Sequence, residues 1–125
     1  DYLATRPEID SNRIGVVGYS MGGNQSFLLP AVDNRIKVVV SCVVPADSGE
    51  WGKPGVVTHN FSARLSDRAV LMCMGKEDGF YTKEQAERIQ ELIPSDKKRL
   101  IWYEAGHKLP VDWVADAVAW IQEHL

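Results

Sequence analysis

The clearest candidate for chemistry in this sequence is a serine flanked by glycines. Ser20 lies in the stretch Gly18-Tyr19-Ser20-Met21-Gly22, a G-x-S-x-G pattern. Between a strand and a helix, such glycines permit a tight turn that lifts the serine hydroxyl into solvent. The helix that follows aims its first backbone N–H groups at negative charge forming on the serine. Glycines also serve to pack strands against helices, so the motif alone leaves a structural role open.

A reactive serine requires two further residues elsewhere in the chain. Its hydroxyl is a weak nucleophile near neutral pH unless a base accepts the proton, and a histidine base is oriented by a carboxylate. Asp78 follows one expected strand and His107 follows the next. The carboxyl ends of parallel strands share one edge of a sheet, so we expect Ser20, Asp78 and His107 to meet there.

These positions depend on an alternation of strands and helices along the chain. Apolar, β-branched runs predict strands over residues 14–18, 36–44, 69–74 and 100–103, and helical spacing predicts helices over 21–32, 83–93 and 111–125. Residues 45–66 show little periodicity and are predicted to form one long loop. This order predicts an α/β fold, a parallel sheet of about four strands with helices on both faces.

Local signals add detail to the predicted helices. Pro30 should bend or end the first helix, and Thr82 is a suitable N-cap for the second. In the last helix one apolar stripe is formed by Val111, Val114, Val118, Ile121 and Leu125, and it is widened by Trp113, Ala117 and Trp120. We therefore expect a strongly amphipathic helix whose tryptophans pack in the core.

Composition limits the classes of protein and partner. The 125 residues, 45% of them hydrophobic and 25% charged, fit one domain over residues 1–125. A net charge of −3 and a single basic cluster, at residues 97–99, argue against nucleic acid as a partner. No apolar run could span a bilayer, and no signal peptide is visible. Cys42 and Cys73 lie in apolar runs, which predicts buried free thiols and slightly favours the cytoplasm.

With these residues in place, the sequence resembles the α/β-hydrolases, and within them the dienelactone-hydrolase-like and acetyl-xylan-esterase-like carboxylesterases. The matching segments are residues 9–23, 75–78 and 106–110 and the closing helix with Trp120. The resemblance implies that Ser20 is the nucleophile, His107 the general base and Asp78 its orienting acid. It also implies that Met21 supplies one oxyanion-hole N–H and that no metal or organic cofactor takes part. Dienelactone hydrolases use cysteine as nucleophile, so a serine favours ester hydrolysis.

The resemblance covers the C-terminal half of that family's fold. The family has earlier strands, and a loop after one of them supplies a second oxyanion N–H; the sequence, which starts at Asp1, shows no counterpart to them. Loss of one such donor typically costs about 10²–10³ in rate. The predicted strand 14–18 would become an apolar edge, so we expect association with an N-terminal half or with a second copy through Ile14–Gly18.

The leading hypothesis is a serine hydrolase that cleaves small carboxylic esters through an acyl-enzyme. One alternative is a catalytically silent half-domain that acts as an interaction module, and another is half of a peptidase of the prolyl-oligopeptidase type. Asp47 and Glu77 are alternative acids, and Tyr19 and Trp51 are candidate substrate-binding residues. No histidine pair has zinc-like spacing, so no metal site is expected.

Overall fold

Four parallel strands follow one another across the sheet in sequence order: β1 (Ile14–Tyr19), β2 (Ile36–Cys42), β3 (Ala69–Gly75) and β4 (Lys98–Tyr103). The computed structural model describes residues 2–44 and 58–125, except for the side chain of residue 59. Every residue of β3 is buried, and so is every residue of β2 except Lys37. Such burial is typical of parallel strands covered on both faces, and the predicted α/β class is confirmed.

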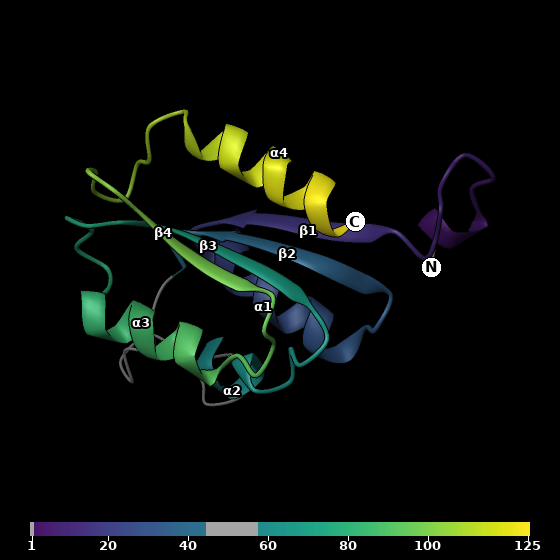
Figure 1. Cartoon of the computed structure of the whole chain (residues 1–125), viewed down its shortest axis with the longest axis horizontal. Coiled ribbons are helices and arrows are strands. Elements are labelled where there is room, and N and C mark those ends of the chain that lie inside the picture. Colours follow the sequence, from purple (N-terminus) through teal and green to yellow (C-terminus); the bar gives the residue numbers. More distant parts are fainter. Residues whose placement is uncertain (1, 45–57) are drawn as a thin grey trace.

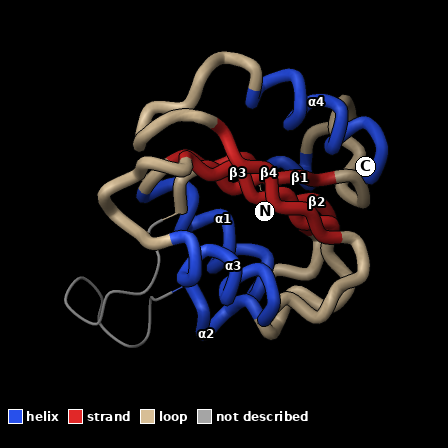
Figure 2. Tube along the Cα trace, turned by 60° about the vertical axis from the view of Figure 1, so that its left-hand side comes forward, coloured by secondary structure: helices blue, strands red, loops and turns tan. Residues whose placement is uncertain are grey.

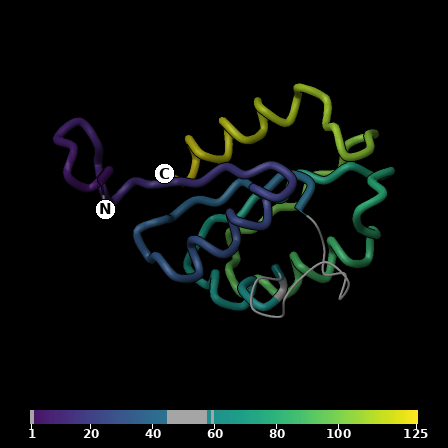
Figure 3. The backbone as a smooth tube through the Cα atoms, turned by 180° about the vertical axis from the view of Figure 1, so that it is seen from behind, coloured from purple at the N-terminus to yellow at the C-terminus, as the bar shows by residue number. Residues whose placement is uncertain are grey.

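The handedness of the crossovers decides which face each helix covers. Because the strand order never reverses, right-handed connections bring all the connecting helices to one face. These helices are α1 (Met21–Val32), α2 (Thr58–Ser62) and α3 (Lys83–Leu92). The last helix, α4 (Trp113–His124), follows the final strand and covers the opposite face (Figure 1, Figure 2). The N-terminal segment, with a short 3-10 turn η1 (Leu3–Thr5), extends beyond the sheet (Figure 3).

One local expectation about the helices was wrong, and two are confirmed. α1 ends at Val32, as predicted, with Pro30 in its last turn. The predicted long loop contains the short helix α2. Thr82 caps α3 as predicted, with its hydroxyl accepting from the N–H of Gln85 at 3.2 Å.

The last helix buries part of the predicted apolar face: the tryptophans, Ile121 and Leu125 pack against the core as expected, and the three valines do not. Ala117 and Trp120 are buried, whereas Val114 and Val118 remain 42% and 47% exposed, and Val111 is more exposed still. Consecutive residues of a helix are about 100° apart around its axis, so two overlapping apolar faces can share one period, and periodicity alone could not choose between them. A tryptophan has far more apolar area to bury than a valine, which favours the observed face.

A buried polar contact joins α4 to the sheet. Tyr103, at the end of β4, donates its hydroxyl proton to Asp116 of α4 at 2.5 Å, and the same oxygen lies 3.8 Å from the sulfur of Cys73. Cys73 pairs in register with Cys42, and both are buried free thiols, as predicted. Burial and the bond to Asp116 raise the pKa of Tyr103 well above its usual value, so it stays protonated.

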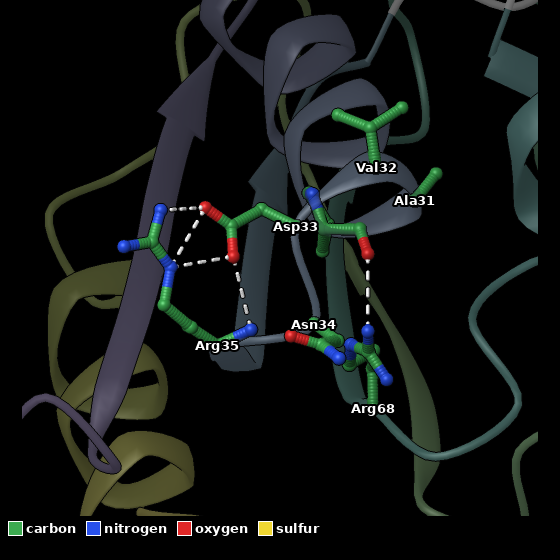
Figure 4. A pocket seen from close by; sticks show the side chains of 7 residues that line it. Ala31, Val32, Asp33, Asn34, Arg35 and Arg68 are labelled. Carbon is green, nitrogen blue, oxygen red and sulfur yellow. Dashed lines mark hydrogen bonds and ion pairs between the residues drawn. The ribbon is translucent and has the colours of Figure 1, made fainter. Parts of the chain in front are cut away.

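A hollow of about 400 Å³ lies at the amino-terminal ends of the strands, opposite the edge where β1 ends at Tyr19. It is lined by Pro30, Ala31, Val32, Asp33, Asn34, Arg35 and Arg68 (Figure 4). Arg35 bonds Asp33, with Nη2 2.5 Å from Oδ2, and lowers the pKa of that carboxyl to about 2. Arg68 donates to the carbonyl oxygen of Pro30 at 3.2 Å, at the negative end of the α1 dipole. The hydrogen bond from Arg68, which lines the hollow, therefore stabilises the end of α1.

None of the helices within residues 2–44 and 58–125 is long and apolar enough to cross a bilayer. The longest of them, α1 and α4, have 12 residues each, and about 20 apolar residues are needed to span the hydrocarbon core.

Candidate active site

The chain turns sharply at Ser20, between the end of β1 and the start of α1. Ser20 has φ 56° and ψ −117°, a positive φ that is uncommon for a residue with a side chain and costs about 1–3 kcal/mol. Its own N–H donates to the carbonyl oxygen of Cys42 at 2.9 Å, which ties the turn to the end of β2. A Cβ at Gly18 would lie 1.9 Å from the carbonyl oxygen of Gly22, so this turn requires glycine there. The predicted tight strand-to-helix turn is present.

The structure brings together the three side chains that the sequence placed at one edge of the sheet. The Oγ of Ser20 lies 2.8 Å from Nε2 of His107, and Nδ1 of His107 lies 2.8 Å from Oδ2 of Asp78. An ionised carboxylate only accepts hydrogen bonds, so Nδ1 carries the proton. Nε2 is then the acceptor that faces the Ser20 hydroxyl. The arrangement can remove a proton from Ser20 as its oxygen attacks an electrophile.

Asp78 and the alternative acid next to it, Glu77, differ in burial. The side chain of Asp78 is 0% exposed, and its second oxygen, Oδ1, accepts from the N–H of Phe80 at 2.9 Å. Glu77 is exposed, and within the described residues its carboxylate makes no hydrogen bond to His107. The phenyl ring of Phe80, which the sequence analysis did not single out, lies with its centroid 4.6 Å from that of His107. No periodic or motif signal distinguishes Phe80 in the sequence.

The loops after β3 and β4 touch each other, which brings Asp78 and His107 within reach. A Cβ at Gly75 would lie 2.2 Å from the carbonyl oxygen of Gly106, so only glycine allows this crossing. The N–H of Glu77 also donates to the carbonyl oxygen of Ala105 at 3.0 Å. These main-chain contacts bring the two loops to one place before any side-chain bond is considered.

Of the remaining predicted site residues, the structure describes Met21 and Tyr19 and does not describe Trp51 and Asp47. Met21 is the first residue of α1, where a backbone N–H has no acceptor within its own helix. The hydroxyl of Tyr19 contacts the main chain of the His107 loop, and its role toward substrate stays a prediction. Trp51 and Asp47 lie outside the described residues.

Comparisons with known proteins bear on the family and on the fold. A family model described as the dienelactone hydrolase family matches residues 1–113. The structure of acetyl xylan esterase 1 from Thermoanaerobacterium sp. JW/SL YS485 aligns with a TM-score of 0.82 at 22% identity, over 98% of this chain and 49% of that one. A Klebsiella pneumoniae subsp. pneumoniae MGH 78578 structure, named as a dienelactone hydrolase, aligns with a TM-score of 0.80 at 18% identity, over 96% and 56%.

A curated relative gives a shorter match. The Bacillus subtilis (strain 168) protein YtaP, named as a hydrolase, is 40% identical over 47 residues, which are 38% of this chain and 16% of YtaP. The two solved structures are only 22% and 18% identical to this chain, and their likeness to it shows the α/β-hydrolase fold. The chain spans about half the length of the two solved structures and a smaller part of YtaP.

Proposed function

The chain belongs to the dienelactone hydrolase family, and on this premise we propose that it is a serine hydrolase of carboxylic esters. The observation that carries the proposal is the chain of two 2.8 Å contacts from Ser20 through His107 to Asp78. A nucleophile bonded to a base that is itself bonded to a buried carboxylate is the arrangement that acyl transfer needs. The acetyl xylan esterase among the structural neighbours is consistent with this reaction class.

The reaction proceeds in two stages. Ser20 Oγ forms a bond to the ester carbonyl carbon while its proton passes to Nε2 of His107. The tetrahedral intermediate collapses, the ester C–O bond breaks, and the leaving alcohol takes the proton from Nε2. Water then attacks the acyl-serine with His107 as base, releasing the acid and restoring Ser20. Asp78 stays ionised throughout and stabilises the imidazolium.

The oxyanion of the intermediate needs N–H donors near Ser20. We assign one donor to the backbone N–H of Met21, at the positive end of the α1 dipole. A single donor is a weak oxyanion hole, since removal of one donor typically costs about 10²–10³ in rate. We therefore propose that a second donor comes from an N-terminal half of the fold that pairs with the edge strand β1.

Two surface features support that pairing. β1 is the first strand in the sheet order, so one side of it has no neighbouring strand among the described residues. Val17 of β1 is 48% exposed, and α4 leaves Val114 and Val118 in solvent on the same face of the sheet. An apolar edge with unpaired main-chain groups favours addition of another strand.

A fluorophosphonate probe tests the proposed activity, because it reacts covalently with serines activated by a neighbouring base. We expect the chain to be labelled and Ser20→Ala to abolish labelling without altering the fold. Ser66→Ala, which removes an exposed serine before β3, is the matched control and should be labelled like the wild type. A folded wild-type chain that resists the probe, both alone and with an N-terminal half added, would favour the silent interaction module.

A further inference from the structure

The loop that carries His107 connects β4 to α4, and residues 104–112 have no helix or strand. Within the described part of the chain, residues 106–109 make their main-chain hydrogen bonds to one group, the hydroxyl of Tyr19. Tyr19 donates its hydroxyl proton to the carbonyl oxygen of His107, and the same oxygen accepts from the N–H of Leu109; each distance is 2.8 Å. One phenol therefore holds the backbone at His107 and two residues beyond it.

We propose that Tyr19 is the positioning residue for the base, a role that rests on the proposed function of Ser20 and His107. Tyr19 is the last residue of β1 and the direct neighbour of Ser20. The nucleophile and the main chain of the base are thereby held by two consecutive residues, the last of β1 and the first of the turn that follows it. A movement of β1 carries both groups together, so their separation is preserved.

The position of the Tyr19 hydroxyl is itself well determined. The backbone of Tyr19 pairs with Cys42 in the sheet register. Its ring lies against Trp113, at the start of α4, with centroids 5.8 Å apart, and meets the ring of His107 edge-on at 6.3 Å. The sheet below and the helix beside it thus restrict the tyrosine before its hydroxyl bonds form, which reduces the entropy lost in forming them.

Tyr19 and Asp78 act on different parts of His107. The bond from Nδ1 to Asp78 sets the rotation of the imidazole and its tautomer. That bond does not hold the main chain of residues 107–109, and a shift of about 1 Å in a reacting group can cost roughly a hundredfold in rate. Tyr19 restricts such a shift because it holds the carbonyl of His107 itself.

Tyr19→Phe tests the role, because it keeps the ring packing and removes both hydrogen bonds. We expect kcat for p-nitrophenyl acetate and the rate of fluorophosphonate labelling to fall together by roughly ten- to a hundredfold, with KM unchanged. By NMR, the Leu109 amide should exchange faster with deuterium. The Nδ1 proton resonance of His107 should broaden, since the imidazole then moves relative to Asp78.

Tyr103→Phe is the matched control. It removes a buried phenol hydroxyl that bonds Asp116 of α4 and leaves the Tyr19 contacts in place. This variant should be less stable and yet keep the wild-type labelling rate per folded molecule, the wild-type Leu109 exchange and the His107 resonance.

The outcomes separate this inference from the proposed function. If Tyr19→Phe keeps either the wild-type labelling rate or the wild-type exchange of Leu109, Tyr19 does not position the base. If the wild-type chain is labelled neither alone nor with an N-terminal half added, the proposed function fails. The Leu109 exchange and the His107 Nδ1 resonance, which need no turnover, would still decide whether Tyr19 holds the loop.

Discussion

At the scale of single residues, Asp78 is the member of the hydrogen-bonded trio whose surroundings best define its task. Both oxygens of its buried carboxylate are used, Oδ1 by the N–H of Phe80 and Oδ2 by Nδ1 of His107. A buried carboxylate is costly unless such donors surround it. The bond to Phe80 also fixes the carboxylate, so that its second oxygen faces the imidazole. In the reaction we propose, Asp78 would therefore orient His107 without moving.

Replacement of Asp78 by asparagine tests this assignment. The amide keeps the size of the carboxylate but can donate to Nδ1, which favours the wrong tautomer of His107. We expect Asp78→Asn to lower kcat by about 10⁴ while circular dichroism and the melting temperature show an intact fold. Glu77→Gln, one residue earlier and exposed, is the matched control and should keep wild-type kcat. If instead Asp47→Asn alone abolished turnover, Asp47 would be the acid.

The residues of this site differ in how far the sequence could predict them. Ser20, Asp78 and His107 each follow a strand, and parallel strands end at one edge, so their meeting follows from topology. The two hydrogen bonds of the Tyr19 hydroxyl and the contact of the Phe80 ring with His107 depend on the path of two irregular loops. Periodicity carries no information about such paths. These contacts therefore became visible only in three dimensions.

At the scale of elements, polar residues and short lengths explain where the predicted bounds fail. The strand predicted over 100–103 begins at Lys98, which an apolar pattern excludes. The Nζ of Lys98 donates to the carbonyl oxygens of Gln90 and Ile93, at 3.1 and 2.6 Å, and so satisfies the end of α3. α2 has only five residues, too few for a helical period to be recognised. The long, strongly periodic elements were predicted within a few residues.

The face of α4 gives a prediction at the same scale. Trp120 is 4% exposed and packs in the core, whereas Val118 is half exposed. Trp120→Ala should lower the free energy of unfolding by about 3–5 kcal/mol, because it leaves a large cavity. Val118→Ser should change it by no more than about 0.5 kcal/mol. Urea unfolding of the two variants under conditions where the chain is monomeric measures both effects. A larger loss for Val118→Ser would mean that the valine stripe faces the core in solution.

At the scale of the whole molecule, the sheet is covered unevenly. Three helices cover one face, and α4 alone covers the other (Figure 1). α4 lies over the inner strands β2 and β3 and reaches β1 at its ends, where Arg13 donates to the carbonyl oxygen of Leu125 at 2.7 Å and Tyr19 meets Trp113. Exposed apolar residues remain beside the free side of β1. The chain spans about half the length of the two solved structures.

We therefore expect the 125-residue chain, on its own, to associate through β1. Sedimentation at micromolar concentrations should show a dimer or larger species. Val17→Lys should shift it to monomer, because a charge on an edge strand opposes pairing with another strand. Val32→Lys is the matched control, since Val32 is exposed at the far end of α1, away from β1.

A wild-type chain that sediments as a monomer, or a Val17→Lys variant that associates as strongly as Val32→Lys, would show that β1 is not the contact surface. An N-terminal half that binds β1 should compete with self-association and raise the labelling rate of Ser20, since it would add the second oxyanion donor.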